Sequence, residues 1–366
     1  MFETIYLSMD ANFKLKQKER GFSDPPLSNG YAYMVSNEKL LEHLAHCGGD
    51  KILKADVSPR LLMLCLLFSD DSIHQAPTCG SSFHAINDAH TKYSAGYAVT
   101  GVGGVDCARH GFKRPVGVVD LQKGERYVPS LCQGNHYLCP VSYANMDLAL
   151  ISTLLLIIGS GLSRILLSYD IACQWAKFFQ RRLSLYPMFS SFLLSSLSYW
   201  RVVVPKFHLA GHGKDCQLNF NINYTKGAGR MTGEMIESGW AQSNSVAIWT
   251  RESGPFARRA VLDDHWGSEN WSKLRRLREW IIYFDRYRLC SLPPSGFSLL
   301  KNLQKALVWS KTQRAVANNA SSRLPPETLA EWNKMRRDFD RDPKSPNPYQ
   351  EPEACKLPGL FVSFPH

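Results

Sequence analysis

Two short apolar runs, far apart in the chain, each end on an aspartate. The first leads into Asp10, and the second, Arg164–Tyr169, leads into Asp170. Glu237 follows much later, near the start of a segment with helical character. Carboxylates held at rigid strand ends and on a helix are the hard oxygen ligands that Mg²⁺ or Mn²⁺ takes. The layout predicts a two-metal phosphoryl-transfer site with Asp10, Asp170 and Glu237 as ligands.

Each of these signals is weak when taken alone. Aspartate is common at strand ends because it favours turns, and Asp120 also ends an apolar run. Glu234 lies on the same predicted helix face as Glu237, but its place after Gly233 suits a residue that caps the helix or complements its dipole. We therefore favour Glu237, with Trp240 on the same side, and leave Glu234 as the alternative.

The order of predicted elements indicates an α/β fold. Glycine-rich and β-branched segments at 96–102 and 115–121 predict a hairpin, and an apolar helix over 148–162 leads into the strand before Asp170. A short strand follows at 200–205, and the chain is mostly helical beyond about residue 230. A ribonuclease-H-like mixed sheet flanked by helices fits this order. It would place the first acid on strand one, the second on strand four and the last on a late helix.

We expect a core over 1–285, a helical extension over 286–341 and a proline-rich tail over 342–366. The core would carry an insertion at about 21–90, with a helix at Asn37–His46. The apolar stretch at 148–162 is shorter than the roughly 20 residues that a membrane helix needs. We therefore expect no membrane association.

The charge balance favours a polyanionic partner, with nucleic acid ahead of membrane. Lys and Arg outnumber Asp and Glu by 43 to 32, which gives a net charge of +11. A solvated helix face is the alternative for such basic clusters. The candidate DNA contacts are Lys14, Lys16, Arg251, Arg258 and Arg259.

The 10 cysteines are irregularly spaced and include no C-x-x-C pair, so a classical zinc finger is not indicated. His208, His212 and Cys216 recur every four residues, and on one helix face they would make a possible Zn²⁺ site. Gly211 and Gly213 weaken that helix. Buried, reduced cysteine is the simpler interpretation for a second group. Its members are Cys107, His110, Cys132, His136 and Cys139.

Several motifs together resemble one family. They are Met-Asp-Ala-Asn-Phe-Lys-Leu at 9–15, Ser-Tyr-Asp-Ile-Ala-Cys-Gln-Trp at 168–175, Pro-Lys-Phe-His-Leu at 205–209 and Gly-Glu-Met-Ile-Glu-Ser-Gly-Trp at 233–240. Thr-Arg-Glu-Ser-Gly-Pro at 250–255 and Leu-Asp-Asp-His-Trp at 262–266 add to the match. From Asp10 to about residue 285 the chain resembles the Kyakuja–Dileera–Zisupton (KDZ) transposases. Within them it is similar to the fungal type associated with a CxC2-like cysteine cluster.

The resemblance implies a ribonuclease-H-like DDE core that cleaves and joins transposon and target DNA with a divalent metal. Asp10, Asp170 and Glu237 would be its three acids. We also expect a nuclear location and a homo-oligomer. Family members usually carry a cysteine-rich region upstream of the first acid, and we expect this chain to lack it. The alternatives are a catalytically inactive transposase-derived remnant that binds DNA or self-associates, and a cellular nuclease of the same fold.

Overall fold

The computed structural model describes residues 4–28, 30–46, 79, 96–121, 129–131, 138–140, 143–184, 195–286, 294–342 and 345–350. The chain divides into two compact units, Met1–Leu303 and Gln304–His366, which are described separately. Across the described residues, no helix combines the length and the apolar character needed to cross a bilayer.

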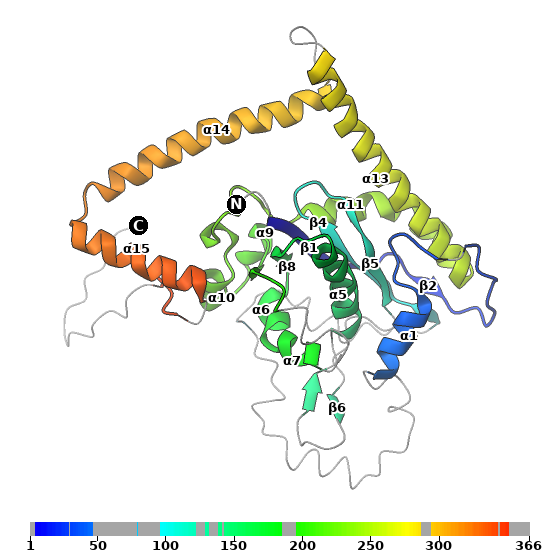
Figure 1. Cartoon of the computed structure of the whole chain (residues 1–366). Coiled ribbons are helices and arrows are strands. Elements are labelled where there is room, and N and C mark those ends of the chain that lie inside the picture. Colours follow the sequence, from blue (N-terminus) through cyan, green and yellow to red (C-terminus); the bar gives the residue numbers. More distant parts are fainter. Residues whose placement is uncertain are drawn as a thin grey trace. The chain divides into compact units, whose positions relative to one another are not determined.

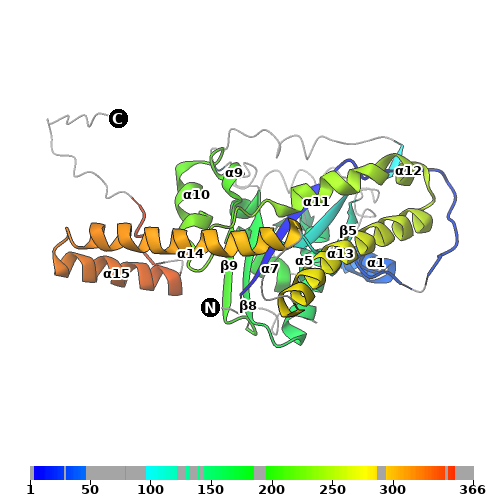
Figure 2. The ribbon, with the colours of Figure 1, turned by 90° about the horizontal axis from the view of Figure 1, so that it is seen from above.

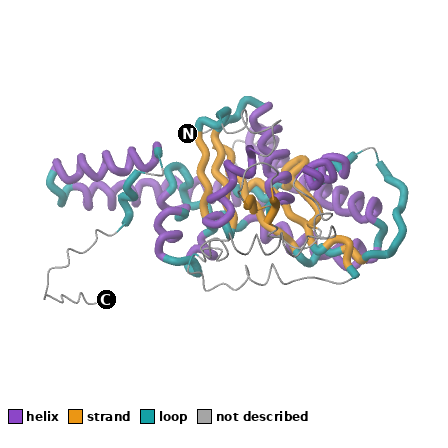
Figure 3. Tube along the Cα trace, turned by 90° about the horizontal axis from the view of Figure 1, so that it is seen from below, coloured by secondary structure: helices purple, strands orange, loops and turns teal. Residues whose placement is uncertain are grey.

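A five-stranded mixed sheet forms the centre of the first unit (Figures 1 and 3). Its strands, in spatial order, are β5 (Lys113–Leu121), β4 (Gly101–Cys107), β1 (Thr4–Asn12), β8 (Arg164–Tyr169) and β9 (Tyr199–Val203). β5, β4 and β1 pair antiparallel, whereas β1, β8 and β9 run parallel. Two small ribbons pair β2 (Gln17–Lys18) with β3 (Tyr97–Val99), and β6 (Pro129–Leu131) with β7 (Leu138–Pro140). The predicted α/β fold with a mixed sheet is confirmed.

Helices lie on both faces of this sheet. In the first unit they are α1 (Asn37–His46), α5 (Ala144–Gly159), α6 (Ala172–Trp175), α7 (Phe179–Ser184), α9 (Lys206–Leu209), α10 (Lys214–Asn219), α11 (Met235–Ser243), α12 (Ala247–Glu252) and α13 (Pro255–Arg286). α14 (Pro294–Ser321) runs from the end of the first unit into the second, which also holds α15 (Pro326–Arg341). In the second unit Phe339 of α15 packs edge-on against Tyr349.

Alternation along the strands decides which residues face which helices. Leu7 and Met9 of β1 belong to the large apolar cluster that α5 covers, and α5 lies in front of the sheet in Figure 1. Side chains of a strand alternate between its two faces, so Tyr6, Ser8 and Asp10 point to the other side. α11 packs against β1 and β4 on that side. Asp10 therefore faces α11, away from the α5 core.

A buried carboxylate fastens the short helices after β8 to α5. Asp147 of α5 accepts a 2.8 Å hydrogen bond from the indole Nε1 of Trp175 and forms an ion pair with Arg182. Both partners come from the segment that follows Asp170. Burial raises the pKa of Asp147, although the Arg182 guanidinium opposes the shift. Because these groups bond to one another in the interior, the segment that follows Asp170 is held to α5.

The described part of the predicted insertion packs on β5 and on α13. The backbone N–H of Val35 donates to the carbonyl of Val118 over 2.8 Å. Asp24 accepts the backbone N–H groups of Phe256 and Ala257, at the start of α13. The predicted helix over Asn37–His46 is confirmed as α1. Most of the remaining insertion lies outside the described residues.

Element boundaries shift from those expected. The segment at 96–102 divides between β3, which pairs with β2, and β4, which pairs with β1 and β5. The apolar helix begins at Ala144 and ends at Gly159, because Gly161 takes a left-handed φ of 80° and turns the chain toward β8. The predicted hairpin is confirmed as β4–β5, and the strand before Asp170 as β8.

Candidate metal centre and nucleic-acid interface

The two aspartates lie at neighbouring positions on adjacent strands. Met9 of β1 pairs in parallel with Tyr169 of β8, and Asp10 and Asp170 are the next residue on each chain (Figure 2 shows the two strands side by side). Paired strands lie about 4.8 Å apart, and residues in parallel register point to the same face. The topology thus brings together the two aspartates that the sequence singled out.

Glu237 reaches the same edge from α11. Gly233, just before this helix, has φ 87°, and a Cβ there would lie 2.3 Å from the Ser168 Oγ. Only glycine combines that backbone conformation with so close an approach to β8. The side chain of Glu237 is half-exposed, and its Oε1 lies 2.8 Å from the Nε2 of His208.

The pKa of Asp170 depends on its burial and on the charged groups around it. Burial raises its pKa most, the His208 charge and the Ile171 backbone N–H oppose the rise, and the negative charge of Glu237 adds to it. The net shift is upward. A divalent cation at this place would offset the effect of the Glu237 charge on Asp170. In composition, these carboxylates are the oxygen ligands that Mg²⁺ or Mn²⁺ takes.

Asp10 is oriented by an indole. Trp240 Nε1 donates a 2.9 Å hydrogen bond to Asp10 Oδ2. The ring fits against Gly104 of β4, where a Cβ would lie 2.8 Å from the Trp240 Cη2 atom. The Trp240 ring also contacts Lys113, whose Nζ lies 3.8 Å from the ring centroid and forms a 2.7 Å ion pair with Asp106. The helical spacing predicted Trp240 beside Glu237, but its bond to Asp10 depends on the packing of α11 against β1 and has no signal in the sequence.

Glu234 has a different role from the one that helix position suggests. It occupies the N-cap position of α11 without a side-chain capping bond to that helix. Its Oε1 instead accepts a 2.6 Å hydrogen bond from the Phe207 backbone N–H, at the start of α9. Glu234 thereby holds α9 against α11, while Glu237 faces His208. The two glutamates therefore have different partners, a backbone N–H for Glu234 and the His208 side chain for Glu237.

A second group of metal-ligand types lies next to the acids. The ligand atoms of Cys79, Cys173, His212 and Cys216 all lie within 4.8 Å of one another. His212 Nδ1 is 3.4 Å from the Cys79 sulfur and 3.5 Å from the Cys173 sulfur. Three of the four residues are buried and Cys79 is half-buried. This Cys₃His group is of a composition that could bind a metal such as zinc.

This Cys₃His group does not have the same members as the predicted zinc site. His212 and Cys216 belong to it, but His208 pairs with Glu237 instead. The expected single helix through 207–216 is broken into α9 and α10 by the turn that holds Gly211 and Gly213, so the i, i+4 stripe does not form. Cys173 and Cys79 take the remaining places. Cys173 lies in the motif that follows Asp170, whereas the sequence gives no local signal for Cys79.

The ionisation of the thiols in this group is linked through their mutual hydrogen bonds. A hydrogen bond with Cys173, and then one with His212, lowers the pKa of Cys216 to about 5 despite burial. The same contact with Cys216, together with burial, raises the pKa of Cys173. The cluster therefore stabilises at least one thiolate, the form of cysteine that ligates metal.

The other predicted cysteine group is described only in part. Cys107 Sγ lies 3.6 Å from His110 Nδ1. Burial opposes ionisation, but the hydrogen bond with His110 lowers the pKa of Cys107 overall. Cys132 and His136 lie outside the described residues, and Cys139 is described only as part of β7.

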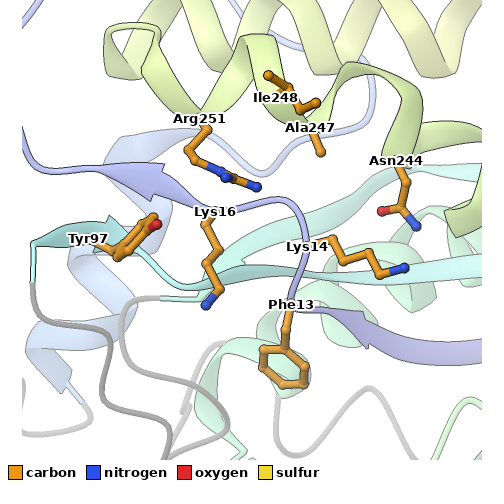
Figure 4. Close-up of a pocket in the computed structure, with 8 residues that line it drawn as sticks. All are labelled: Phe13, Lys14, Lys16, Tyr97, Asn244, Ala247, Ile248 and Arg251. Carbon is orange, nitrogen blue, oxygen red and sulfur yellow. The ribbon is translucent and has the colours of Figure 1, made fainter.

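Three of the five predicted DNA contacts line one pocket of about 580 Å³. Figure 4 shows Lys14 and Lys16, from the segment after β1, across from Arg251 of α12. The other lining residues are Phe13, Tyr97, Asn244, Ala247 and Ile248. Asn244 accepts a 3.0 Å hydrogen bond from Asn12, two residues beyond Asp10. The pocket thus combines cationic and aromatic side chains, and two of its cations, Lys14 and Lys16, shortly follow Asp10 in the chain.

The prediction that Arg258 and Arg259 contact DNA is wrong, because both side chains are buried. Arg258 Nη1 donates to Asp120 Oδ1 over 2.6 Å, and its Nη2 donates to the carbonyl of Leu15. Arg259 bonds the carbonyl of Val35 and lies 3.6 Å from Asp120. The two arginines fasten α13 to β5 and to the segment after β1.

Comparison with known proteins identifies the family. The chain matches the family model described as Kyakuja-Dileera-Zisupton transposase over residues 3–132 and 140–270. The match covers most of the chain, and the protein belongs to the KDZ transposase family. No curated protein and no solved structure matches it significantly. The family implies a DNA-binding, nucleic-acid-processing enzyme that uses a metal cofactor.

Proposed function

We propose that the chain is the catalytic core of a DDE-type transposase with a ribonuclease-H-like fold. One observation carries the proposal: Asp10 and Asp170 follow paired positions on adjacent parallel strands, and the charge of Glu237 acts on Asp170. Asp10 lies in the first strand of the central sheet in chain order, Asp170 directly follows the fourth, and Glu237 is on a later helix. This is the distribution of acids that a ribonuclease-H-like core predicts.

The three acids would hold two Mg²⁺ or Mn²⁺ ions. Such ions supply an activated water or 3′-hydroxyl and stabilise the leaving oxygen of an in-line displacement at phosphorus. The protein's part is to keep the acids in place. Trp240 fixes Asp10 through its indole N–H, and Ile171 donates its backbone N–H to Asp170 over 2.8 Å. His208 holds Glu237.

The basic pocket supplies the complementary surface for DNA. Lys14, Lys16 and Arg251 would present positive charge to a phosphate backbone, and the Nζ of Lys16 lies 5.2 Å from the centroid of the Tyr97 ring. Strand cleavage at the acids and strand transfer from the freed 3′-hydroxyl are the reactions we assign to this site. The nuclear location, the homo-oligomer and the fungal CxC2-associated subtype belong to the same proposal.

A nicking assay on supercoiled DNA with Mg²⁺ or Mn²⁺ tests the proposal. Wild type should cleave only when the metal is added, and Asp170→Ala and Asp10→Asn should reduce cleavage to background. Asp264→Asn, which removes an exposed acid of α13, is the matched control and should cleave like wild type.

Two outcomes contradict the proposal. Cleavage that survives Asp170→Ala would exclude these acids as the metal ligands. DNA binding without any metal-dependent cleavage would favour the alternative of an inactive, transposase-derived remnant.

A comparison of Glu234→Gln with Glu237→Gln tests which glutamate is the third acid. The first should retain cleavage, because the Gln amide oxygen can still accept the Phe207 N–H, and the second should abolish cleavage in a stable protein.

A further inference from the structure

We propose that Cys79, Cys173, His212 and Cys216 bind one Zn²⁺ ion, which links the turn after Asp170 to the segment that carries His208. The site is separate from the three acids and has a different ligand chemistry. Zinc binding itself does not depend on the proposed function, and only the consequence for catalysis rests on it.

The spacing of the ligand atoms suits tetrahedral zinc. With Zn–S bonds of about 2.3 Å and Zn–N bonds of about 2.0–2.1 Å, the sulfur and nitrogen atoms of a tetrahedral site lie about 3.6 Å apart. The Nδ1 of His212 lies 3.4 Å from one cysteine sulfur and 3.5 Å from another. All four ligand atoms fall within 4.8 Å of one another. The four ligand atoms are therefore gathered closely enough for a single ion to bind all of them.

The donor set selects zinc over the ions that suit the acids. Three thiols and an imidazole are soft to borderline ligands, whereas Mg²⁺ and Mn²⁺ prefer oxygen. Four protein ligands also complete a tetrahedral shell and leave no position for water or substrate. The site is accordingly a structural zinc site, distinct from the catalytic metals.

The backbone holds the ligands in place from three separate segments. The N–H of Gly213 donates to the carbonyl of Cys79 over 2.8 Å, which joins Cys79 to the turn that carries His212. The Gln217 side chain donates to the carbonyl of His212 over 2.6 Å. Cys216 lies on α10 and Cys173 on α6. A metal bound here cross-links residues that are distant in sequence.

The cross-link lies beside the acids on two sides. Cys173 is three residues after Asp170, and His212 is four residues after His208, which bonds Glu237. The zinc would thus fix the distance between the strand end with the second acid and the segment that orients the third. Loss of zinc should loosen both segments while the sheet remains folded.

Metal analysis of the purified full-length chain tests the site directly. Wild type should contain about one zinc per chain, and Cys173→Ser and Cys216→Ser should each reduce zinc to near zero. His212→Cys should retain the metal, because four thiolates also make a tetrahedral zinc site. Cys107→Ser is the matched control and should retain about one zinc per chain. A wild-type protein without zinc, or full zinc in Cys216→Ser, would overturn the proposal.

A second measurement protects the test against variants that fail to fold. Co²⁺ added to chelator-treated wild type should produce the thiolate charge-transfer and d–d absorption of a tetrahedral site, and Zn²⁺ should displace it. An intact mass lower by two hydrogens, with a disulfide between two of these cysteines and no cobalt spectrum, would overturn the proposal instead.

The outcome is separable from that of the proposed function. Asp10→Asn should lose cleavage and keep its zinc. Removal of zinc from wild type should raise hydrogen exchange over 171–175 and 206–219 more than over β1 and β4. Equal exchange in the zinc-bound and zinc-free proteins would contradict the linking role.

Discussion

Two groups of basic residues that look alike in sequence have opposite environments in the structure. Arg258 and Arg259 are adjacent and buried, and they share Asp120. Lys14, Lys16 and Arg251 come from two segments and line a pocket. The first group stabilises the packing of a helix, and the second remains at a surface where it can meet phosphate. The comparison shows that two neighbouring arginines are weak evidence of DNA binding, because a nearby carboxylate such as Asp120 can engage them in the interior instead.

The same contrast recurs within the basic run after β1. Lys18 lies 2.7 Å from Glu252, and Arg20 also pairs with Glu252. These contacts hold α12 beside the run, and Gln17 adds a hydrogen bond to the carbonyl of Ser253. Two of the four cations in the run are therefore engaged in structure, while Lys14 and Lys16 line the pocket.

The largest expected effect is on stability. Arg258→Ala leaves Asp120 buried and without its closest cation, and breaking a buried pair in this way costs about 3–5 kcal/mol. Urea unfolding should show the loss, whereas Arg275→Ala, at an exposed position of α13, should change stability by less than about 0.5 kcal/mol. If the Arg258→Ala protein were as stable as wild type but bound DNA more weakly, Arg258 would have to be assigned to DNA binding instead of helix packing.

The next effect is on DNA affinity. When Lys14, Lys16 and Arg251 are replaced together by Ala, the slope of log K against log salt concentration should become shallower by up to about 2.7. The affinity for DNA at 0.1 M salt should fall on the order of a hundredfold. Fluorescence anisotropy over a salt series measures both quantities. The control removes three exposed cations outside the pocket, Lys39, Lys334 and Arg337, and should leave more of the affinity. Equal losses in both proteins would argue against the pocket.

A smaller effect should follow at the start of α13, which carries the buried arginines. Modest burial raises the pKa of Asp24, but the N–H donors of Phe256 and Ala257 outweigh it and lower the pKa overall. The capping contribution is therefore complete above the unfolded pKa and disappears as pH falls through the lowered folded pKa. Asp24→Ala should cost about 1 kcal/mol at pH 7. The difference from wild type should shrink at acid pH, and a constant difference would exclude the cap.

The smallest effect concerns the surface pairs. Glu252→Gln removes the negative charge beside Arg251 and frees Lys18 and Arg20 from their shared partner. DNA affinity should rise slightly, because fewer of the cations near the pocket are neutralised. The thermal midpoint should stay close to that of wild type, since exposed ion pairs contribute little. Weaker binding by this variant would show that the pairs position the pocket.

Much of the fold was predictable because it depends on local pattern. The helix at α1, the β4–β5 hairpin and the strand before Asp170 were confirmed from apolar periodicity and glycine placement. The convergence of Asp10 and Asp170 is different, because it depends on the parallel pairing of β1 with β8, and no local signal sets the pairing of segments 160 residues apart.

The remainder depends on contacts between distant residues. Asp120 seemed an ordinary strand-end aspartate, yet it is the partner that buries Arg258. Cys79 and Cys173 joined His212 only through the tertiary structure, and the turn at 210–213 separated His208 from the stripe. Periodicity describes one segment at a time, so it could not reveal groups assembled from several.

The close fit of Trp240 against Gly104 has a consequence for how related sequences are interpreted. A relative with alanine at position 104 would keep all three acids, yet the added methyl group would push the indole away from Asp10. Counting retained acids would then classify a decayed copy as intact. Under the proposed mechanism, the glycine paired with Asp10 is therefore a further position to inspect when active and inactive relatives are to be told apart.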